Sequence, residues 1–177
     1  MIKFEGETCE EQLEYAEQLV ARYKYDSMTG LKGRIDFDEA FERMVDSRIY
    51  DSRSFTFALA DINGLKQTND NYGYLAGDDL IKKVAHDLVQ AFGKTATIYR
   101  FGGDEFAILC TNISRIKAKN TFSKIHDSHN FSYGVIESEE VDWKNHDCKS
   151  IFNFVNALLH DAKADFKESK RLKKEQA

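Results

Sequence analysis

The sequence predicts an α+β fold in which one sheet packs against helices, preceded by a helical segment. Three observations favour it. The chain has 177 residues, which suits one domain and an additional helix. Its hydrophobic fraction of 42% can fill a single core. Beyond the first helix, hydrophobic periods follow the order helix, strand, helix, hairpin, helix, strand, helix, which favours one antiparallel or mixed sheet covered by helices.

The first segment is expected to be a helix because apolar residues recur at the spacing of a coiled-coil seam. They are Cys9, Leu13, Ala16, Val20 and Tyr23. Two interpretations stay open, a short intermolecular coiled coil and an amphipathic helix packed on its own domain. A loop-forming stretch follows, so we expect residues 1–25 to be a linker helix and residues 26–177 to be the domain.

The domain is expected to open with a helix over residues 36–44 and a strand over residues 54–62. In this strand both faces are apolar, as in a central strand, but Asp61 continues the row of Phe57 and Leu59. An acid therefore stands where the alternation calls for an apolar side chain. After a stretch rich in Gly and Asn, a helix is expected over residues 78–92.

The next stretch predicts a β-hairpin, because Gly102 and Gly103 separate two runs rich in aromatic and β-branched residues. If the second strand begins near Asp104, Phe106 shares a face with Ile108 and Cys110, and Glu105 lies on the other. The two acids at this tip suit either a solvated turn or a metal site. A helix over residues 114–126, a strand over 130–136 and a helix over 151–166 complete the domain, and the charged tail after Phe166 is expected to fray.

Charge and cysteine content narrow the functional classes. The net charge of −5, with both signs interspersed, argues against a broad surface for nucleic acid or an anionic membrane, but allows a local basic pocket for phosphate. Cys9, Cys110 and Cys148 form no CxxC pair, which argues against a disulfide framework or zinc ribbon. No apolar run approaches the ~20 residues that span a bilayer. We expect a cytoplasmic protein without nucleic-acid or membrane partners.

Two acids stand where a central sheet could bring them together, Asp61 at the end of a strand and Asp104 at the hairpin tip. Mg²⁺ takes one or two carboxylates and completes its shell with waters and substrate phosphates. Gly64, just after Asp61, would let a phosphate approach backbone N–H groups. These residues therefore favour a nucleotide site that uses a hard divalent cation.

Three motifs resemble, in order and spacing, the signatures of GGDEF-domain diguanylate cyclases. They are D-S-M-T-G-L-K-G-R at 26–34, D-I-N-G-L-K-Q-T-N-D-N-Y-G-Y-L-A-G-D at 61–78 and R-F-G-G-D-E-F at 100–106. The resemblance covers about residues 26–167. It implies a palm-like, ferredoxin-like sheet of the nucleotidyl cyclase kind. It also implies two Mg²⁺ or Mn²⁺ ions per site and condensation of two GTP into cyclic di-GMP across an antiparallel homodimer, with an upstream sensor as a possible partner.

The resemblance also assigns site residues. It implies that Asp61, Asp104 and the Ile62 carbonyl hold the metal ions, and that Glu105 supports catalysis. The substrate-binding residues fall into groups for guanine, for the triphosphate, and for the loops beside the metals. They are Asn69 and Asp78 for guanine, Lys163 and Lys167 for the triphosphate, and Gly64, Leu65, Lys66 and Gly103 for the loops.

Several positions depart from the family pattern. Asn63 replaces a frequent second acid, Tyr74 replaces a usual His, and Phe166 and Lys167 replace Gly and Arg. The R-x-x-D inhibitory site is missing, because its positions hold Gly93 and Ala96. An active cyclase is the leading hypothesis. A catalytically weak GGDEF domain that binds GTP or a regulatory partner, and a plain interaction domain that dimerises through its first helix, stay open as alternatives.

Overall fold

The computed structural model describes residues 8–51, 53–126 and 129–175. The ends of the predicted linker and domain, at residues 1–7 and 176–177, lie outside the described residues. The division at residue 25 therefore stays a prediction.

Four strands form one sheet, in the spatial order β2, β3, β1, β4. Their bounds are Phe55–Ile62 for β1, Ala96–Arg100 for β2, Glu105–Thr111 for β3 and Phe131–Glu137 for β4. All three strand pairs are antiparallel, which decides between the antiparallel and mixed arrangements. The predicted palm-like α+β fold is confirmed, and the Gly102–Gly103 stretch makes the predicted hairpin between β2 and β3.

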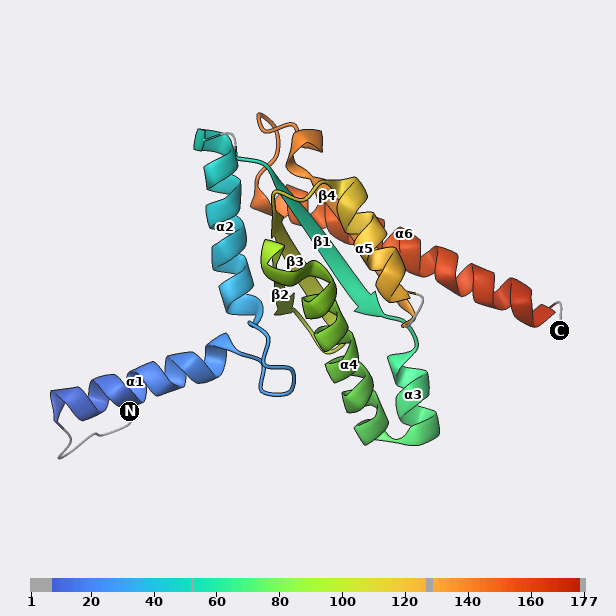
Figure 1. Ribbon diagram of the computed structural model, residues 1–177, viewed down its shortest axis with the longest axis horizontal. Coiled ribbons are helices and arrows are strands. Elements are labelled where there is room, and N and C mark those ends of the chain that lie inside the picture. Colours follow the sequence, from blue (N-terminus) through green and yellow to red (C-terminus); the bar gives the residue numbers. More distant parts are fainter. Residues whose placement is uncertain (1–7, 52, 127–128, 176–177) are drawn as a thin grey trace.

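Helices cover both faces of the sheet (Figure 1). Their bounds are α1 Cys9–Lys24, α2 Arg34–Asp51, α3 Leu65–Tyr72, α4 Tyr74–Phe92, α5 Arg115–His126 and α6 Cys148–Glu175, with short 3₁₀ helices η1 Gly93–Thr95 and η2 Ser138–Glu140. α4 and α5 pack on one face, and α2 and α6 pack on the other. The sheet is therefore the middle layer of three, and the ends of its central strands lie between helices.

The two faces follow from strict alternation along the central strands. In β1, Ala58, Ala60 and Ile62 join the core under α4 and α5, whereas Phe57 and Leu59 join the core under α2 and α6. Each face of β1 is thus covered, so the strand is buried along its whole length. Alternation in β3 follows the same rule, as predicted.

Several helices differ from the prediction, and α2 extends to Asp51 where an end at residue 44 was expected. α3 lies in the Gly- and Asn-rich stretch where no helix was expected, and α4 begins at Tyr74, four residues before the predicted start. α3 has few apolar residues and none that is buried, so no periodic pattern announces it. The charged tail after Phe166 does not fray, because α6 continues to Glu175.

α1 projects away from the sheet and its helices (Figure 1). Thr8 and Glu11 form a capping box that begins the helix. Leu13 and Val20 of the predicted seam are 60% and 51% exposed, and Ala16 is also exposed. The interpretation that the seam packs on its own domain is therefore wrong for these residues. Within the described residues, no helix combines the length and apolar character that crossing a bilayer requires.

Candidate active site

The predicted acids meet where β1 ends and β3 begins. Asp61 lies directly opposite Glu105 in the antiparallel ladder, and the Ile62 N–H donates to the Asp104 carbonyl at 3.1 Å. Asp61 is only 3% exposed, because the alternation places it on the face that α2 and α6 cover. Glu105 belongs to the row of Ala107 and Leu109 on that same face. The sheet thus brings three acids to one end of its central strands.

A cation from the last helix neutralises part of this charge. The Lys163 Nζ on α6 lies 2.7 Å from the Asp61 Oδ2. Burial raises the pKa of Asp61 above its ordinary value; Lys163 acts against this shift, and the carboxylates of Asp104 and Glu105 add to it. The ion pair joins two residues that the resemblance assigned to different ligands, one to metal and one to triphosphate.

The substituted position Asn63 is integrated into the sheet. Its Nδ2 donates to the Ser132 Oγ at 2.9 Å, and the Ser132 hydroxyl donates back to the Asn63 Oδ1 at 3.2 Å. Its backbone N–H donates to the Asn130 carbonyl at 2.9 Å. An ionised acid at this position could not donate the hydrogen bond to Ser132. Compared with such an acid, Asn63 gives the site one negative charge less and links β1 to β4 through its side chain.

The hairpin tip is held by one arginine. Arg100 Nη1 contacts the Asp26 Oδ1 at 2.9 Å and Oδ2 at 3.0 Å, and its Nη2 donates to the Gly103 carbonyl at 2.8 Å. Burial alone would raise the pKa of Asp26, but hydrogen bonds from Thr29 and Arg100 outweigh it and lower that pKa below its ordinary value. The loop after α1 and the tip that carries Asp104 are therefore fastened to the same guanidinium.

The residues predicted to bind guanine lie on two consecutive helices, Asn69 on α3 and Asp78 on α4. Gly64, at φ 82°, begins α3 in the left-handed conformation that favours glycine. One helix later, Gly77 leaves room for the Asn69 side chain, because a Cβ on Gly77 would lie 1.8 Å from the Asn69 Oδ1. This oxygen is buried without a hydrogen-bond partner among the described residues. Asp78 follows Gly77 directly and is half-buried.

The other predicted substrate residues lie around these two clusters. Leu65 is half-buried and packs against the core at the start of α3, and Lys66 beside it is exposed. Gly103 is exposed at the hairpin tip. Lys167 is exposed one turn beyond Lys163 on α6, the spacing that places both on one helix face. The structure therefore brings the acids together with Lys163, and it brings Asn69 against Gly77, the residue before Asp78.

The donor set suits a hard divalent cation. Among residues 8–51, 53–126 and 129–175, no three carboxylate, imidazole or thiolate side chains form a group that could hold a metal by themselves. Mg²⁺ commonly uses one or two carboxylates and completes its shell with water and phosphate oxygens. Asp61 and Asp104, which interact electrostatically across the end of the sheet, fit that smaller requirement.

The comparison with protein families decides the identity of the fold. Residues 23–165 match the model described as diguanylate cyclase, GGDEF domain. The chain belongs to the GGDEF domain family. Its hairpin R-F-G-G-D-E-F, which gives the family its name, is the one that carries Asp104 and Glu105.

Similar proteins agree with this GGDEF assignment. The chain is 30% identical over 156 residues to the diguanylate cyclase VdcA of Vibrio cholerae, covering 78% of this chain and 44% of that protein. It is 38% identical over 84 residues to DgcP of Pseudomonas aeruginosa, covering 48% of this chain and 12% of that one. The chain thus spans less than half the length of these curated relatives.

Among solved structures, the coiled coil and GGDEF domain of DgcB from Caulobacter crescentus in complex with c-di-GMP superimposes with a TM-score of 0.77. It is 21% identical and the match covers 88% of each chain. At this identity the likeness shows the fold alone. The GGDEF domain described above therefore shares its architecture with a structure that also includes a coiled coil.

Sequence reasoning missed two residues that position the GGDEF site. Arg100 and Gly77 both lie inside the quoted motifs but received no role. Arg100 directly precedes F-G-G-D-E-F, and a cationic side chain beside a turn could have suggested an anchor for the tip. Gly77 directly precedes Asp78, and a glycine inside a helix is a signal of close packing.

Proposed function

We propose that this GGDEF domain is a diguanylate cyclase, which condenses two GTP into cyclic di-GMP and two pyrophosphates across a pair of domains. The observation that carries the proposal is the meeting of Asp61, Asp104 and Glu105 at the end of the central strands, with Lys163 2.7 Å from Asp61. These carboxylates can bind cations, and they lie near the start of α3, whose N-cap is Gly64. In the reaction each 3′-hydroxyl oxygen forms a bond to the partner's α-phosphorus, the bond to the β-phosphate oxygen breaks, and the hydroxyl proton is released.

Asn69 and Asp78 would select the base. The Asp78 carboxylate can accept hydrogen bonds from guanine N1–H and N2–H₂, which adenine does not offer as a pair. The Asn69 side chain can lie against α4 because Gly77 has no side chain to exclude it. A ligand in this site would favour guanine over adenine, since a buried polar group left unpaired costs binding free energy.

The acids would handle the charge of the triphosphate. Asp61 and Asp104, with the carbonyl of Ile62, would hold Mg²⁺ or Mn²⁺, which neutralises phosphate charge and lowers the pKa of the attacking hydroxyl. Glu105 lies opposite Asp61 on the adjacent strand, so it can hold or accept a proton near the same end of the sheet. These roles need ionised carboxylates, so we expect activity only at pH values above the raised pKa of Asp61.

Lys163 would change partners when the substrate binds. Its ammonium compensates the buried Asp61 carboxylate, and its side chain is 28% exposed. Lys163 would then be able to turn from Asp61 to a phosphate oxygen, with Lys167 one turn further along α6. Gly64, Leu65, Lys66 and Gly103 would complete the phosphate-binding loops with their backbone groups.

Two copies must meet for this chemistry. One domain holds one GTP, and a ring with two identical linkages needs two triphosphates in antiparallel array. α1, with Leu13 and Val20 exposed, is the segment we propose for bringing copies together. In this proposal residues 1–25 form the linker and residues 26–177 the catalytic domain.

The test is incubation with GTP and Mg²⁺ or Mn²⁺, followed by chromatography of the products. Cyclic di-GMP and pyrophosphate are expected in a 1:2 ratio from the wild type, as the stoichiometry requires. Asp104→Ala should yield none, because a metal-binding carboxylate is lost. Asp79→Ala, an exposed acid on α4, is the matched control and should retain wild-type turnover. Binding of GTP without product would instead identify a regulatory GTP-binding domain, and equal turnover of ATP would contradict the base assignment.

A further inference from the structure

β4 is an edge strand whose outer side is unpaired. The hydrogen bond from Asn63 to Asn130 fixes the phase of the β1–β4 ladder. In an antiparallel ladder alternate residues bond to the neighbouring strand, so Ser132 and Gly134 bond to β1. Phe131, Tyr133 and Val135 then direct their N–H and C=O groups to the outer edge. In the part of the chain that the structure describes, these outer groups have no hydrogen-bond partner.

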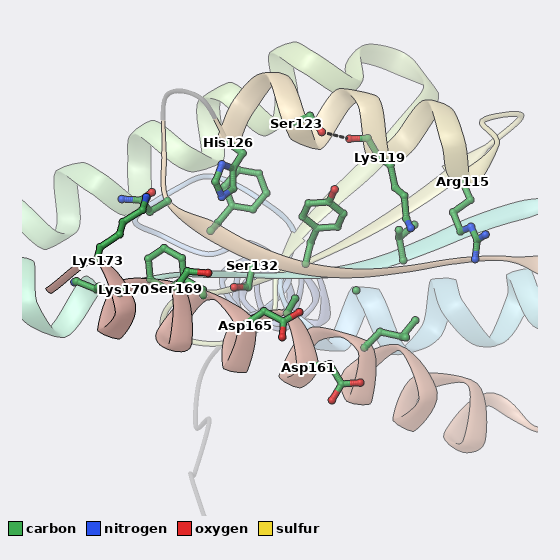
Figure 2. A pocket seen from close by; sticks show the side chains of 18 residues that line it. Arg115, Lys119, Ser123, His126, Ser132, Asp161, Asp165, Ser169, Lys170 and Lys173 are labelled. Atoms are coloured by element: carbon green, nitrogen blue, oxygen red, sulfur yellow. Dashed lines mark hydrogen bonds between the residues drawn. The ribbon is translucent and has the colours of Figure 1, made fainter. Parts of the chain in front are cut away.

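This edge lies in a groove rather than on an open surface. Figure 2 shows β4 running between α5 and α6, with side chains of both helices standing on either side of it. The groove has a volume of about 920 Å³ and is lined along β4 from Asn130 to Val135. Its lining does not include Asp61, Asp104, Asn69 or Asp78, and it adjoins the proposed GTP site only through Ser132, which pairs with Asp61 in the β1–β4 ladder.

The two walls of the groove differ in chemistry. On α5, Arg115 and Lys119 reach toward β4 (Figure 2), and Lys119 has no ion-pair partner among the described residues, whereas Arg115 is paired with Glu140. On α6, Leu158, Ala162 and Phe166 form an apolar stripe at four-residue spacing. The charged groups of the lining are Arg115, Lys119, Lys170 and Lys173 against Asp161 and Asp165, and the Lys170 ammonium donates to the Gln67 Oε1 at 2.8 Å. The groove is thus basic, on a chain whose net charge is −5.

We propose that this groove binds an extended acidic segment of a partner protein, which adds a strand to the sheet beside β4. Backbone pairing would satisfy the outward groups of Phe131, Tyr133 and Val135. Side chains of an added strand alternate between the two sides of the sheet. Carboxylates at alternate positions would face Lys119 on α5, and apolar residues between them would face Leu158 and Ala162 on α6.

A second copy of the chain suits this groove less well. Its own β4 edge is flanked by α5 and α6, so two such edges cannot both reach the depth at which their backbones pair. The two basic linings would also face each other, and like charges at close range are unfavourable. An isolated extended segment meets neither obstacle, and its negative charge complements the lining.

The test uses the whole chain and two blocked peptides about six residues long, the usual length of a strand. One alternates valine with glutamate, and the other alternates valine with lysine. Amide hydrogen exchange is followed by NMR at Phe131, Tyr133 and Val135, with Ser132 and Gly134 as internal references because they bond to β1. In the free protein the first group should exchange faster than the references. The glutamate peptide should slow it, and the lysine peptide should bind more weakly.

A charge reversal on α5 locates the contact. Lys119→Glu should weaken binding of the glutamate peptide by about three- to tenfold, because an attraction becomes a repulsion at an exposed site. Lys124→Glu on the same helix is the control, since Lys124 is exposed but does not line the groove, and it should bind as the wild type does. Neither variant touches the GTP site, so cyclase activity should persist in both.

Three results would overturn the proposal. Slow exchange of Phe131, Tyr133 and Val135 in the free protein would show that the edge is already covered, by this chain or by a second copy. Equal affinity for both peptides, or for Lys119→Glu and wild type, would show that the charge of the groove does not select its occupant. Failure of the glutamate peptide to slow the three amides would exclude strand addition.

Discussion

Replacing Gly77 with alanine tests the guanine assignment without changing any residue assigned to the substrate. Gly77 is helical and its φ is not positive, so its backbone accepts an alanine. The new Cβ would lie 1.8 Å from the Asn69 Oδ1 and 2.9 Å from its Cγ, distances that no real contact reaches. Asn69 must therefore rotate away from α4. Leu65 Cδ1, at 3.2 Å, needs to move only slightly.

Gly77→Ala is expected to keep or slightly raise the stability of the fold and to lower the affinity for GTP. Alanine in a helix interior is more favourable than glycine by about 0.5 to 1 kcal/mol. Rotation of Asn69 also releases its buried, unpartnered oxygen. The free energy of unfolding of Gly77→Ala should thus equal or slightly exceed that of the wild type. Loss of a hydrogen bond to guanine should cost about 1 to 2 kcal/mol of binding free energy, or roughly five- to thirtyfold in Kd.

Titration calorimetry with a non-hydrolysable GTP analogue, paired with urea denaturation, measures both quantities. Asn69→Ala should lose the same affinity, and the double variant Gly77→Ala with Asn69→Ala should lose no more, because both changes remove one interaction. Asp79→Ala, on the same helix, should bind normally. A folded Gly77→Ala variant with wild-type GTP affinity would refute the reasoning that Gly77 holds Asn69 in a guanine-binding position.

Three further predictions concern the acids, the linker and feedback. Asp61→Asn should abolish turnover while changing the free energy of unfolding by no more than about 1 kcal/mol at neutral pH. Because burial raises the pKa of Asp61, ionisation of this carboxyl destabilises the wild type. The free energy of unfolding of the wild type, relative to that of Asp61→Asn, should therefore fall as the pH rises from the ordinary aspartate pKa to the raised native pKa. A series of urea melts at different pH values measures this difference. Glutamate at both Leu13 and Val20 should lower specific activity at limiting protein but not GTP binding, and activity that is flat on dilution for both proteins would oppose α1-assisted pairing. Inhibition by cyclic di-GMP through residues 93–96 should be absent, since Gly93 and Ala96 carry no guanidinium or carboxylate, and a product-inhibition assay checks this.

The sheet and its two faces could be predicted from the sequence because they follow local alternation. Phe57 and Leu59 on one side and Ala58 and Ala60 on the other fix which core each joins. The same alternation placed Asp61 where an apolar side chain was called for, and the structure shows that Asp61 is only 3% exposed. The local hydrophobic pattern was therefore enough to predict the elements whose residues are buried.

Contacts between distant segments could not be predicted in this way. The pairing of Lys163 with Asp61 joins α6 to β1, and no local period in either segment encodes it. The resemblance placed both residues in the site but assigned them different ligands. α3 was missed for another reason, since it buries no residue and is rich in Asn and Asp, which favour caps and turns over helix interiors.

The fastening of Asp26 by Arg100 has a mechanical consequence. Arg100 also donates its backbone N–H to the Lys32 carbonyl at 2.9 Å, and Lys32 pairs with both Tyr25 and Tyr99. The loop after α1 is thus hydrogen-bonded to β2, and through Arg100 to the hairpin tip, at several points within a few residues. We therefore expect a rotation of α1 to move the hairpin that carries Asp104, because the loop between them has several fixed contacts to β2 and to the tip.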